Sequence, residues 1–228
     1  MSGLDKLPKG SRILDVGCGI GGSSRILAKY YGFNVTGITI SPAQVKRARE
    51  LTPIEVNCSF QVMDALDLKF ENGSFDAIWS VEAGAEMNDK INFGYEMLRT
   101  LRPGGYLALA DWNSRDLSAN PPSFFEKLVL KQLLEQWVHP NFVSINDFAN
   151  ILGNNKNSAG IVSCENWNPY TNPSWYDSIF EGIRRPFTIL SLGPFAIIKS
   201  IREIPTIILM NWAFKKGLME FGVYKCRG

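Results

Sequence analysis

The chain has 228 residues, a length typical of one domain or of one domain with an enlarged half. Hydrophobic residues make up 45 %, which suffices for a buried core and excludes a disordered chain. Lysine and arginine number 24 against 22 acidic residues, and a net charge of +2 gives no indication of a nucleic-acid partner. The four cysteines are far apart with no CxxC, and the N-terminus shows no apolar signal segment. We therefore interpret the chain as a cytoplasmic protein with reduced thiols and no metal site.

Short apolar runs alternate with helical patterns through the first half of the chain. The predicted strands occupy residues 11–16, 34–40, 59–63, 75–81 and 106–112. The predicted helices cover 23–31, a segment that starts at Ser41, and 89–101, where Pro103-Gly104-Gly105 is expected to stop the last one. Ser41, Pro42 and Gln44 fit a helix start with a capping box. Because strands that alternate with helices form parallel sheets, we expect an α/β fold whose sheet is buried on both faces.

After residue 112 the alternation ends. Ser123 and Glu126 form a second capping box, which predicts a long helix to about Val138. Further strands are predicted at 160–167 and 221–226, with apolar, proline-interrupted helices over 173–214. We interpret residues 1–228 as one domain, in which 1–116 bind a cofactor and 117–228 form an apolar cap and the final strands.

Residues 13–22 read ILDVGCGIGG, and Gly17, Gly19 and Gly22 satisfy G-x-G-x-x-G. In an open parallel sheet, ligands bind beyond the carboxyl ends of the strands. A nicotinamide enzyme would need a carboxylate at the end of the second strand to hold the ribose, and residues 37–41 contain none. The carboxylate is Asp15, which suits a cationic ligand such as S-adenosylmethionine. The alternative is a tight turn that binds no ligand.

Four further motifs lie at the ends of the later predicted strands. Met63-Asp64-Ala65 and Ser80–Gly84 end the third and fourth, while Asn72–Asp76 and Leu101–Gly105 lead into the fourth and fifth. DVGCGIGG and the Pro-Gly-Gly turn resemble the class I S-adenosylmethionine-dependent methyltransferases. The stretches DVGCGIGGSSRILAKYYGFNVTGITISPAQVKRA, SVEAGAEMNDK and LRPGGYLALADWNSRD resemble the tocopherol C-methyltransferase branch. The resemblance implies a doubly wound, mostly parallel sheet of seven strands, a Rossmann-like fold with an apolar helical cap inserted in its C-terminal half. It also implies a methyltransferase that uses S-adenosylmethionine.

The resemblance further implies a set of cofactor-binding residues: Asp15, Gly17, Cys18, Gly19, Thr39, Ile40, Gln44, Asp64, Ala65 and Ser80. Asp15, Gly17 and Gly19 would line the methionine part, and Thr39, Ile40 and Gln44 would surround the ribose and adenine. Asp64 and Ala65 would hold the adenine edge, and Ser80 would lie near the methionine end. Three of them also have simpler explanations. Gln44 completes a capping box, Asp64 fits a solvated loop, and Ser80 fits as a small packed residue.

Methyl transfer from a sulfonium is a displacement that requires no metal, but methylation of a phenolic ring gains from a base. The catalytic candidates are Glu86, Glu82 and Asp111. The resembling family usually has histidine before Met87, where this chain has Glu86. The only histidine, His139, lies before Pro140 and is a further candidate.

Many aromatic side chains lie between Trp112 and Phe214. They indicate either a binding site for an apolar small-molecule substrate or the packed core of a cap. The tryptophans of this region include Trp137, Trp167, Trp175 and Trp212. The resemblance implies a prenylated phenol or quinol, such as a precursor of tocopherol or plastoquinol. A sterol or a small amine as acceptor, and a nicotinamide oxidoreductase, are the alternatives.

Two features concern the ends of the chain. Eleven residues precede Arg12, whereas the resembling family carries helices there. We therefore expect either a truncated or mis-started chain, or a site that is more open than usual. A cofactor-binding protein of low activity, or a scaffold without catalysis, is the corresponding alternative. Arg184-Arg185 and Lys215-Lys216 flank apolar helices, which favours either peripheral membrane contact through 184–216 or a buried cap.

Overall fold

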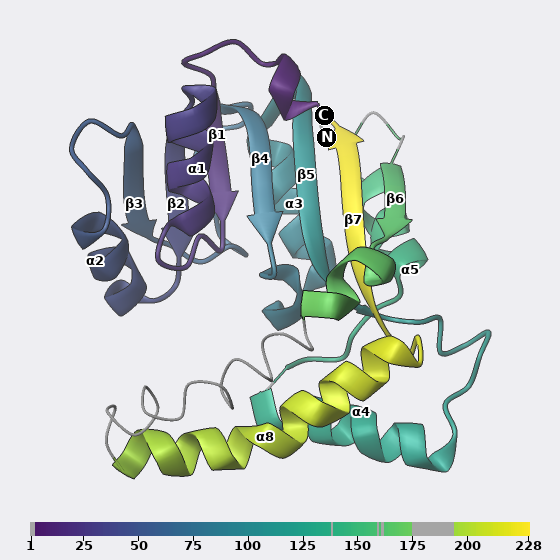
Figure 1. Ribbon diagram of the computed structural model, residues 1–228. Helices are drawn as coiled ribbons and strands as arrows, with labels where there is room; N and C mark the ends of the chain where they lie inside the picture. Colours follow the sequence, from purple (N-terminus) through teal and green to yellow (C-terminus); the bar gives the residue numbers. More distant parts are fainter. Residues whose placement is uncertain (1–2, 138, 159, 161, 175–193) are drawn as a thin grey trace. The chain divides into compact units, whose positions relative to one another are not determined.

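The structure is a computed structural model that describes residues 3–137, 139–158, 160, 162–174 and 194–228, without the side chains of Trp137 and 194–201 (Figure 1). The chain forms two compact units. The first comprises Met1–Asp111, Asn146–Glu165 and Val223–Gly228, and the second comprises Trp112–Ile145 and Asn166–Gly222. The candidate cofactor-binding residues all belong to the first unit.

Seven strands form one sheet in the order β3-β2-β1-β4-β5-β7-β6. They are β1 (Arg12–Val16), β2 (Asn34–Thr39), β3 (Cys58–Val62), β4 (Phe75–Val81), β5 (Leu101–Ser114), β6 (Val162–Asn166) and β7 (Met219–Arg227). Strands β1 to β5 run parallel, and β7 runs against them (Figure 1). The seven-stranded, mostly parallel sheet predicted from the sequence is confirmed.

The helices connect the strands in the βαβ manner. They are α1 (Gly22–Tyr31), α2 (Pro42–Glu50), α3 (Lys90–Thr100), α4 (Phe124–Trp137), α5 (Ile145–Gly153) and α8 (Pro194–Lys215), with single turns η1 (Leu4–Lys6) and η2 (Gly84–Glu86). In Figure 1, α1 lies in front of the sheet and α3 behind it. The central strands are therefore covered on both sides, and Ile13, Leu14 and Ile78 are fully buried. Helix α5 has no counterpart among the predicted elements.

The Pro-Gly-Gly turn lies inside β5 and does not end a helix, contrary to the prediction. Phe75 pairs with Leu101 and Ala77 pairs with Tyr106, so residues 102–105 bulge out of the ladder. Helix α3 stops at Thr100 because Leu101 already has extended backbone angles. The turn therefore sets the register between β4 and β5.

The two capping boxes predicted from the sequence differ in the structure. At α4 the box is reciprocal, because Ser123 N donates to Glu126 Oε2 (2.8 Å) and Glu126 N donates to Ser123 Oγ (3.3 Å). At α2 only half of it forms, since Ser41 Oγ accepts from Gln44 N but the Gln44 side chain bonds elsewhere. The box at Ser123 is confirmed, and the box predicted at Ser41 is wrong in its return bond.

The apolar C-terminal region is helical over α8, as predicted, and Pro205 lies inside that helix. Residues 175–193, which include Trp175 and Arg184-Arg185, lie outside the described residues. Among the helices that are described, none is long and apolar enough to cross a membrane.

Candidate cofactor and active site

The turn after β1 contains several glycines, and each is needed for a different structural reason. Gly17, Gly19 and Gly21 have left-handed backbones, with φ of 75°, 54° and 76°, while Gly22 begins α1. A Cβ on Gly17 would overlap the Cβ of Ala83, whereas a Cβ on Gly19 would meet nothing within 4 Å. Gly17 is thus required for packing, and Gly19 leaves open space where a ligand can approach the backbone.

Asp15 lies beneath this turn and is only 1 % exposed. Its Oδ2 accepts hydrogen bonds from Ser23 Oγ (2.9 Å) and Ser24 Oγ (2.5 Å) at the start of α1. Burial raises the pKa of this carboxyl group, against the opposing effect of the two hydroxyls. The carboxylate ties β1 to α1, and its role toward methionine stays a prediction. Two serines directly after the glycines were the signal for this anchor, which the sequence reasoning missed.

Cys18 is buried within the same turn. Burial raises the pKa of its thiol to about 12, and the nearby Asp15 carboxylate adds to the shift. The thiol is therefore neutral at physiological pH and does not act as a nucleophile. Its place in the turn is consistent with packing beside a ligand, which stays a prediction.

The turn after β2 is held by a side-chain bond between Thr39 and Gln44. The Thr39 hydroxyl donates to Gln44 Oε1 at 2.6 Å, which explains why Gln44 does not complete the capping box. Between them, Ile40 is 71 % exposed at the carboxyl end of the strand. Thr39 and Gln44 shape this turn, and cofactor contacts of Thr39, Ile40 and Gln44 stay predictions.

Two further apolar side chains are exposed at the same edge of the sheet. Ile20 follows β1 and is 47 % exposed, and Val62 ends β3 and is 50 % exposed. Single exposed apolar residues are common, but Ile20, Ile40 and Val62 follow three adjacent strands. Of the three, only Ile40 is among the predicted cofactor residues.

The remaining predicted cofactor residues have local roles in the structure. Asp64 is exposed, and its Oδ1 accepts from Leu66 N at 2.8 Å, while Ala65 is buried. Ser80 is 1 % exposed and donates to the Val16 carbonyl at 2.9 Å, which joins β4 to β1. Cofactor contacts of these three residues stay predictions.

The turn after β4 carries two of the three catalytic candidates. Glu82 is exposed and has φ of 55°, the one non-glycine residue with positive φ in the part of the chain that is described. Glu86 is exposed at the end of η2, whereas Ala83 and Ala85 are buried. A left-handed glutamate is strained, which indicates that the surrounding packing imposes this turn.

Lys90 holds the same turn from the start of α3. Its Nζ donates to the carbonyl oxygens of Gly84 (2.6 Å), Ala85 (2.9 Å) and Met87 (2.8 Å). Burial lowers the pKa of this amine, and the charge of Asp111 acts in the opposite direction. The sequence reasoning missed Lys90, and no local pattern identifies it, because its three acceptors are backbone atoms.

Asp111, the third catalytic candidate, lies in a different environment. It is 3 % exposed near the end of β5, and a Cβ added to Gly84 would overlap its Oδ2. The carboxylate is thus packed against the backbone of the turn and interacts with the charge of Lys90. Of the three candidates, Glu82 and Glu86 are accessible to an acceptor, and Asp111 is placed to support the turn.

His139 belongs to the second unit and packs among aromatic rings. Its ring centroid lies 5.8 Å from that of Trp112 and 5.6 Å from that of Phe142. These contacts give the histidine a packing role, and a catalytic role stays a prediction.

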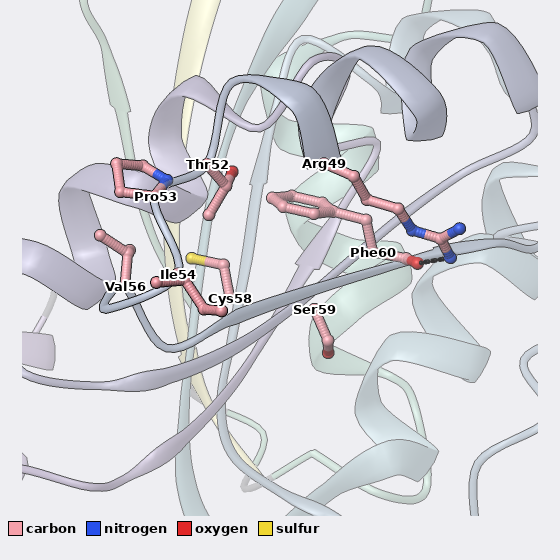
Figure 2. Close-up of a pocket in the computed structure, with 8 residues that line it drawn as sticks. All are labelled: Arg49, Thr52, Pro53, Ile54, Val56, Cys58, Ser59 and Phe60. Atoms are coloured by element: carbon pink, nitrogen blue, oxygen red, sulfur yellow. Dashed lines mark hydrogen bonds between the residues drawn. The ribbon is translucent and has the colours of Figure 1, made fainter.

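A pocket of about 320 Å³ lies where the connection from α2 enters β3 (Figure 2). Its lining consists of Arg49, Thr52, Pro53, Ile54, Val56, Cys58, Ser59 and Phe60. Arg49 Nη2 donates to the Phe60 carbonyl at 2.6 Å along one wall. The pocket opens at the amino end of β3, whereas ligands of open parallel sheets bind beyond the carboxyl ends. It is therefore distinct from the candidate cofactor site.

Comparison with known proteins decides the family. Residues 14–109 match a family described as "Methyltransferase domain". The 2-methyl-6-phytyl-1,4-hydroquinone methyltransferase of Synechocystis sp. is 56 % identical over 98 % of this chain and 70 % of its own length. The chain belongs to the class I S-adenosylmethionine-dependent methyltransferases. The predicted enzyme class and the predicted cofactor are confirmed.

Two more relatives of this methyltransferase act on different acceptors by their names. The chloroplastic tocopherol O-methyltransferase of Arabidopsis thaliana is 37 % identical over 95 % of this chain and 62 % of its own length. The norajmaline N-methyltransferase of Rauvolfia serpentina is 32 % identical over 98 % of this chain and 77 % of its own length. The methyltransferase thus spans less than two thirds of the Arabidopsis relative.

Solved structures share the fold of this methyltransferase at low identity. One is the phosphoethanolamine N-methyltransferase 2 of Haemonchus contortus in complex with S-adenosyl-L-methionine. It superposes with a TM-score of 0.81 at 19 % identity, and the match covers 97 % of this chain and 49 % of that chain. The geranyl diphosphate C-methyltransferase of Streptomyces coelicolor gives 0.72 at 19 % identity, covering 96 % and 75 %. These two likenesses establish the architecture and leave the acceptor undecided.

Proposed function

We propose that this methyltransferase adds a methyl group to a ring carbon of a prenylated hydroquinone of the 2-methyl-6-phytyl-1,4-hydroquinone kind. The observation that carries the proposal is the 56 % identity to the Synechocystis enzyme, which extends over 98 % of the chain. Such identity includes the second unit as well as the glycine turn, so the resemblance is not confined to the part that binds the cofactor.

An amine acceptor is the second candidate, supported by the norajmaline N-methyltransferase at 32 % identity. A neutral amine carries its own lone pair, so its methylation requires no proton transfer from a hydroxyl. A hydroquinone ring carbon becomes a better nucleophile as the neighbouring hydroxyl loses its proton, so a base should contribute. The role of the accessible glutamates therefore differs between the two candidates.

The residues at the carboxyl edge of the sheet fit the cofactor. S-adenosylmethionine supplies a methyl group that is already activated by the positive charge on sulfur. The open space at Gly19 lets the backbone approach a ligand, and the Asp15 carboxylate beneath it can offset a positive charge. Ile20 and Ile40, which are exposed at this edge, would cover the adenine. Alignment of the methyl group with the acceptor, away from water, can lower the activation free energy by roughly 7–11 kcal/mol.

On the acceptor side, we assign the base to Glu86, with Glu82 as the next candidate. Glu86 is exposed on a turn that Lys90 fixes through three carbonyls. Its carboxylate would take the hydroxyl proton of the hydroquinone. The ring carbon then forms its bond to the methyl carbon, while the carbon–sulfur bond breaks and leaves its electron pair on sulfur. The hydrogen on that ring carbon departs as a proton, and aromaticity returns.

A three-acceptor assay tests the proposal. The purified protein is incubated with methyl-labelled S-adenosylmethionine and, separately, with 2-methyl-6-phytyl-1,4-hydroquinone, a tocopherol that lacks one ring methyl group, and norajmaline. We expect the fastest turnover with the hydroquinone, and mass spectrometry should place the new methyl group on ring carbon. Faster methylation of norajmaline, or label on oxygen, contradicts the proposal. The Gly19→Val variant serves as the control for contaminating activity.

A further inference from the structure

Helices α4 and α8 expose large apolar side chains in the second unit. On α4, Phe124 is 80 %, Phe125 53 % and Leu128 49 % exposed, and on α8, Ile204 is 49 % and Ile208 51 % exposed. We call these five residues the α4–α8 surface. Both helices also bury apolar residues, so the exposed ones are not needed to hold the helices in the unit.

The two helices pack side by side and run antiparallel (Figure 1). The rings of Phe125 and Trp212 lie 5.2 Å apart, edge to face. At the other end of the pair, Gln136 Nε2 donates to Glu203 Oε1 at 3.2 Å. An early residue of α4 therefore meets a late residue of α8, and a late one meets an early one.

This antiparallel register gathers the exposed apolar residues into one area. Leu128 follows Phe125 by one turn, and Ile208 precedes Trp212 by one turn, so the two lie at the same level of the pair. Phe124 lies at the level of the last turn of α8, where Lys215 and Lys216 are exposed. Phe124, Leu128 and Ile208 therefore lie in the half of the helix pair that contains the Phe125–Trp212 contact.

Positively charged side chains are exposed on and next to the same two helices. The exposed cations on and next to the two helices are Lys127, Lys131, Arg202, Lys215 and Lys216. The acidic residues of these helices are fewer, and two have partners: Glu126 with Arg115 at 2.8 Å and Glu135 with Lys131 at 3.7 Å. Glu203 accepts from Gln136 and is half-buried. The surface therefore combines apolar side chains with a net positive charge.

We propose that the α4–α8 surface docks on an anionic lipid bilayer. Aromatic and aliphatic side chains of this size insert at the boundary between headgroups and acyl chains, and lysine and arginine beside them are attracted by anionic lipids. A protein partner is less favoured, because exposed lysines are depleted from the centres of protein interfaces. The proposal depends on the α4–α8 surface and not on the identity of the acceptor. A hydroquinone dissolved in the bilayer would give the enzyme a reason to bind there.

Vesicle co-sedimentation without any acceptor tests the docking. The full chain is mixed with vesicles of phosphatidylglycerol and phosphatidylcholine in equal parts, and with vesicles of phosphatidylcholine alone. We expect binding to the anionic vesicles that weakens as salt rises. The variant Lys127→Gln/Lys131→Gln/Lys215→Gln should bind about 100-fold more weakly, at roughly fivefold for each lysine. The matched control Lys6→Gln/Lys29→Gln/Lys46→Gln removes the same charge elsewhere and should lose much less.

A second pair of variants tests the apolar component. Phe124→Ser/Leu128→Ser/Ile208→Ser should reduce binding at least tenfold, because each side chain contributes apolar area to the interface. The control Ile26→Ser/Tyr30→Ser/Ile54→Ser changes exposed apolar residues of the first unit and should bind like the wild type. Absent binding to anionic vesicles, or equal losses in the surface and control variants, overturns the proposal. Neither result affects the proposed acceptor, which is tested by the separate acceptor assay without vesicles.

Discussion

The turn after β1 and the turn after β4 follow adjacent strands of the sheet but are stabilised differently. The first is built from neighbours in sequence, because glycines allow its left-handed residues and Ser23 and Ser24 satisfy Asp15. The second contains a strained Glu82 and depends on Lys90 and on Asp111 from a different strand. If the proposed roles are right, the first turn binds the cofactor with a backbone fixed by local contacts. The second would then place Glu86 by contacts between distant segments.

The largest effect is expected at Glu86, in the second turn. Glu86→Gln should lower kcat by roughly 100-fold to 10,000-fold with a hydroquinone, while cofactor affinity is unchanged, because the base is lost but the turn is kept. Glu86→His should keep activity with a pH profile shifted toward that of an imidazole. Steady-state kinetics with calorimetry measure this, and Glu71→Gln is the control. A wild-type rate in Glu86→Gln would transfer the role to Glu82.

Gly17 lies where the turn after β1 packs against Ala83 in the turn after β4. Gly17→Ala should lower the free energy of unfolding by about 3 kcal/mol, because the new Cβ overlaps the Cβ of Ala83 and the backbone is left-handed. Urea denaturation measures the change. Gly10→Ala is the matched control, with φ of 83° and open space, and should cost only about 1–2 kcal/mol. Equal losses would show that the two turns are not packed together.

A substitution at Gly19 tests whether the turn after β1 binds the cofactor. Gly19→Val should weaken S-adenosylhomocysteine binding by about 100-fold, equal to roughly 3 kcal/mol, because a branched side chain fills the space that the ligand would use. Titration calorimetry measures the affinity, and circular dichroism checks that the fold is retained. Gly10→Val imposes similar backbone strain away from the site and should bind normally. Unchanged affinity in Gly19→Val would count against this site.

Lys90 tests whether the second turn must be fixed. Lys90→Met should lower kcat roughly tenfold and leave the KM for the cofactor nearly unchanged, because Glu86 would no longer be held in place. Lys69→Met, at an exposed site, is the control. A purely structural role of Lys90 would instead lower the melting temperature without changing kcat of the folded enzyme.

The smallest effect concerns the ionisation of Asp15. Burial raises the pKa of this carboxyl group, so its negative charge is lost as the pH falls through that raised value. The affinity for cationic S-adenosylmethionine should therefore decrease by a few-fold as the pH falls, and the decrease should begin at a higher pH than for an exposed aspartate, measured by calorimetry. Asp15→Asn has no such charge at any pH and should bind weakly with a flat profile. A flat profile in the wild type would separate Asp15 from the cofactor.

The parallel sheet, its glycine turn and the cofactor class could be predicted from the amino-acid sequence. Runs of mostly apolar or β-branched residues located β1 to β4 to within about one residue, although β3 is largely exposed and β1 buries Asp15. The Gly17 and Gly19 pattern was likewise visible, because left-handed turns favour glycine. These features depend on residues close together in the chain.

The tertiary structure alone decided which candidate residues are accessible and which are structural. Gln44 was expected to cap α2 and instead bonds Thr39, and Asp111 was expected to act as a base and lies buried against Gly84. Lys90 has no sequence signal, because its acceptors are backbone carbonyls placed by the fold of the turn. Periodicity specifies which face of an element is buried, but contacts between distant segments form only when the strands are set side by side.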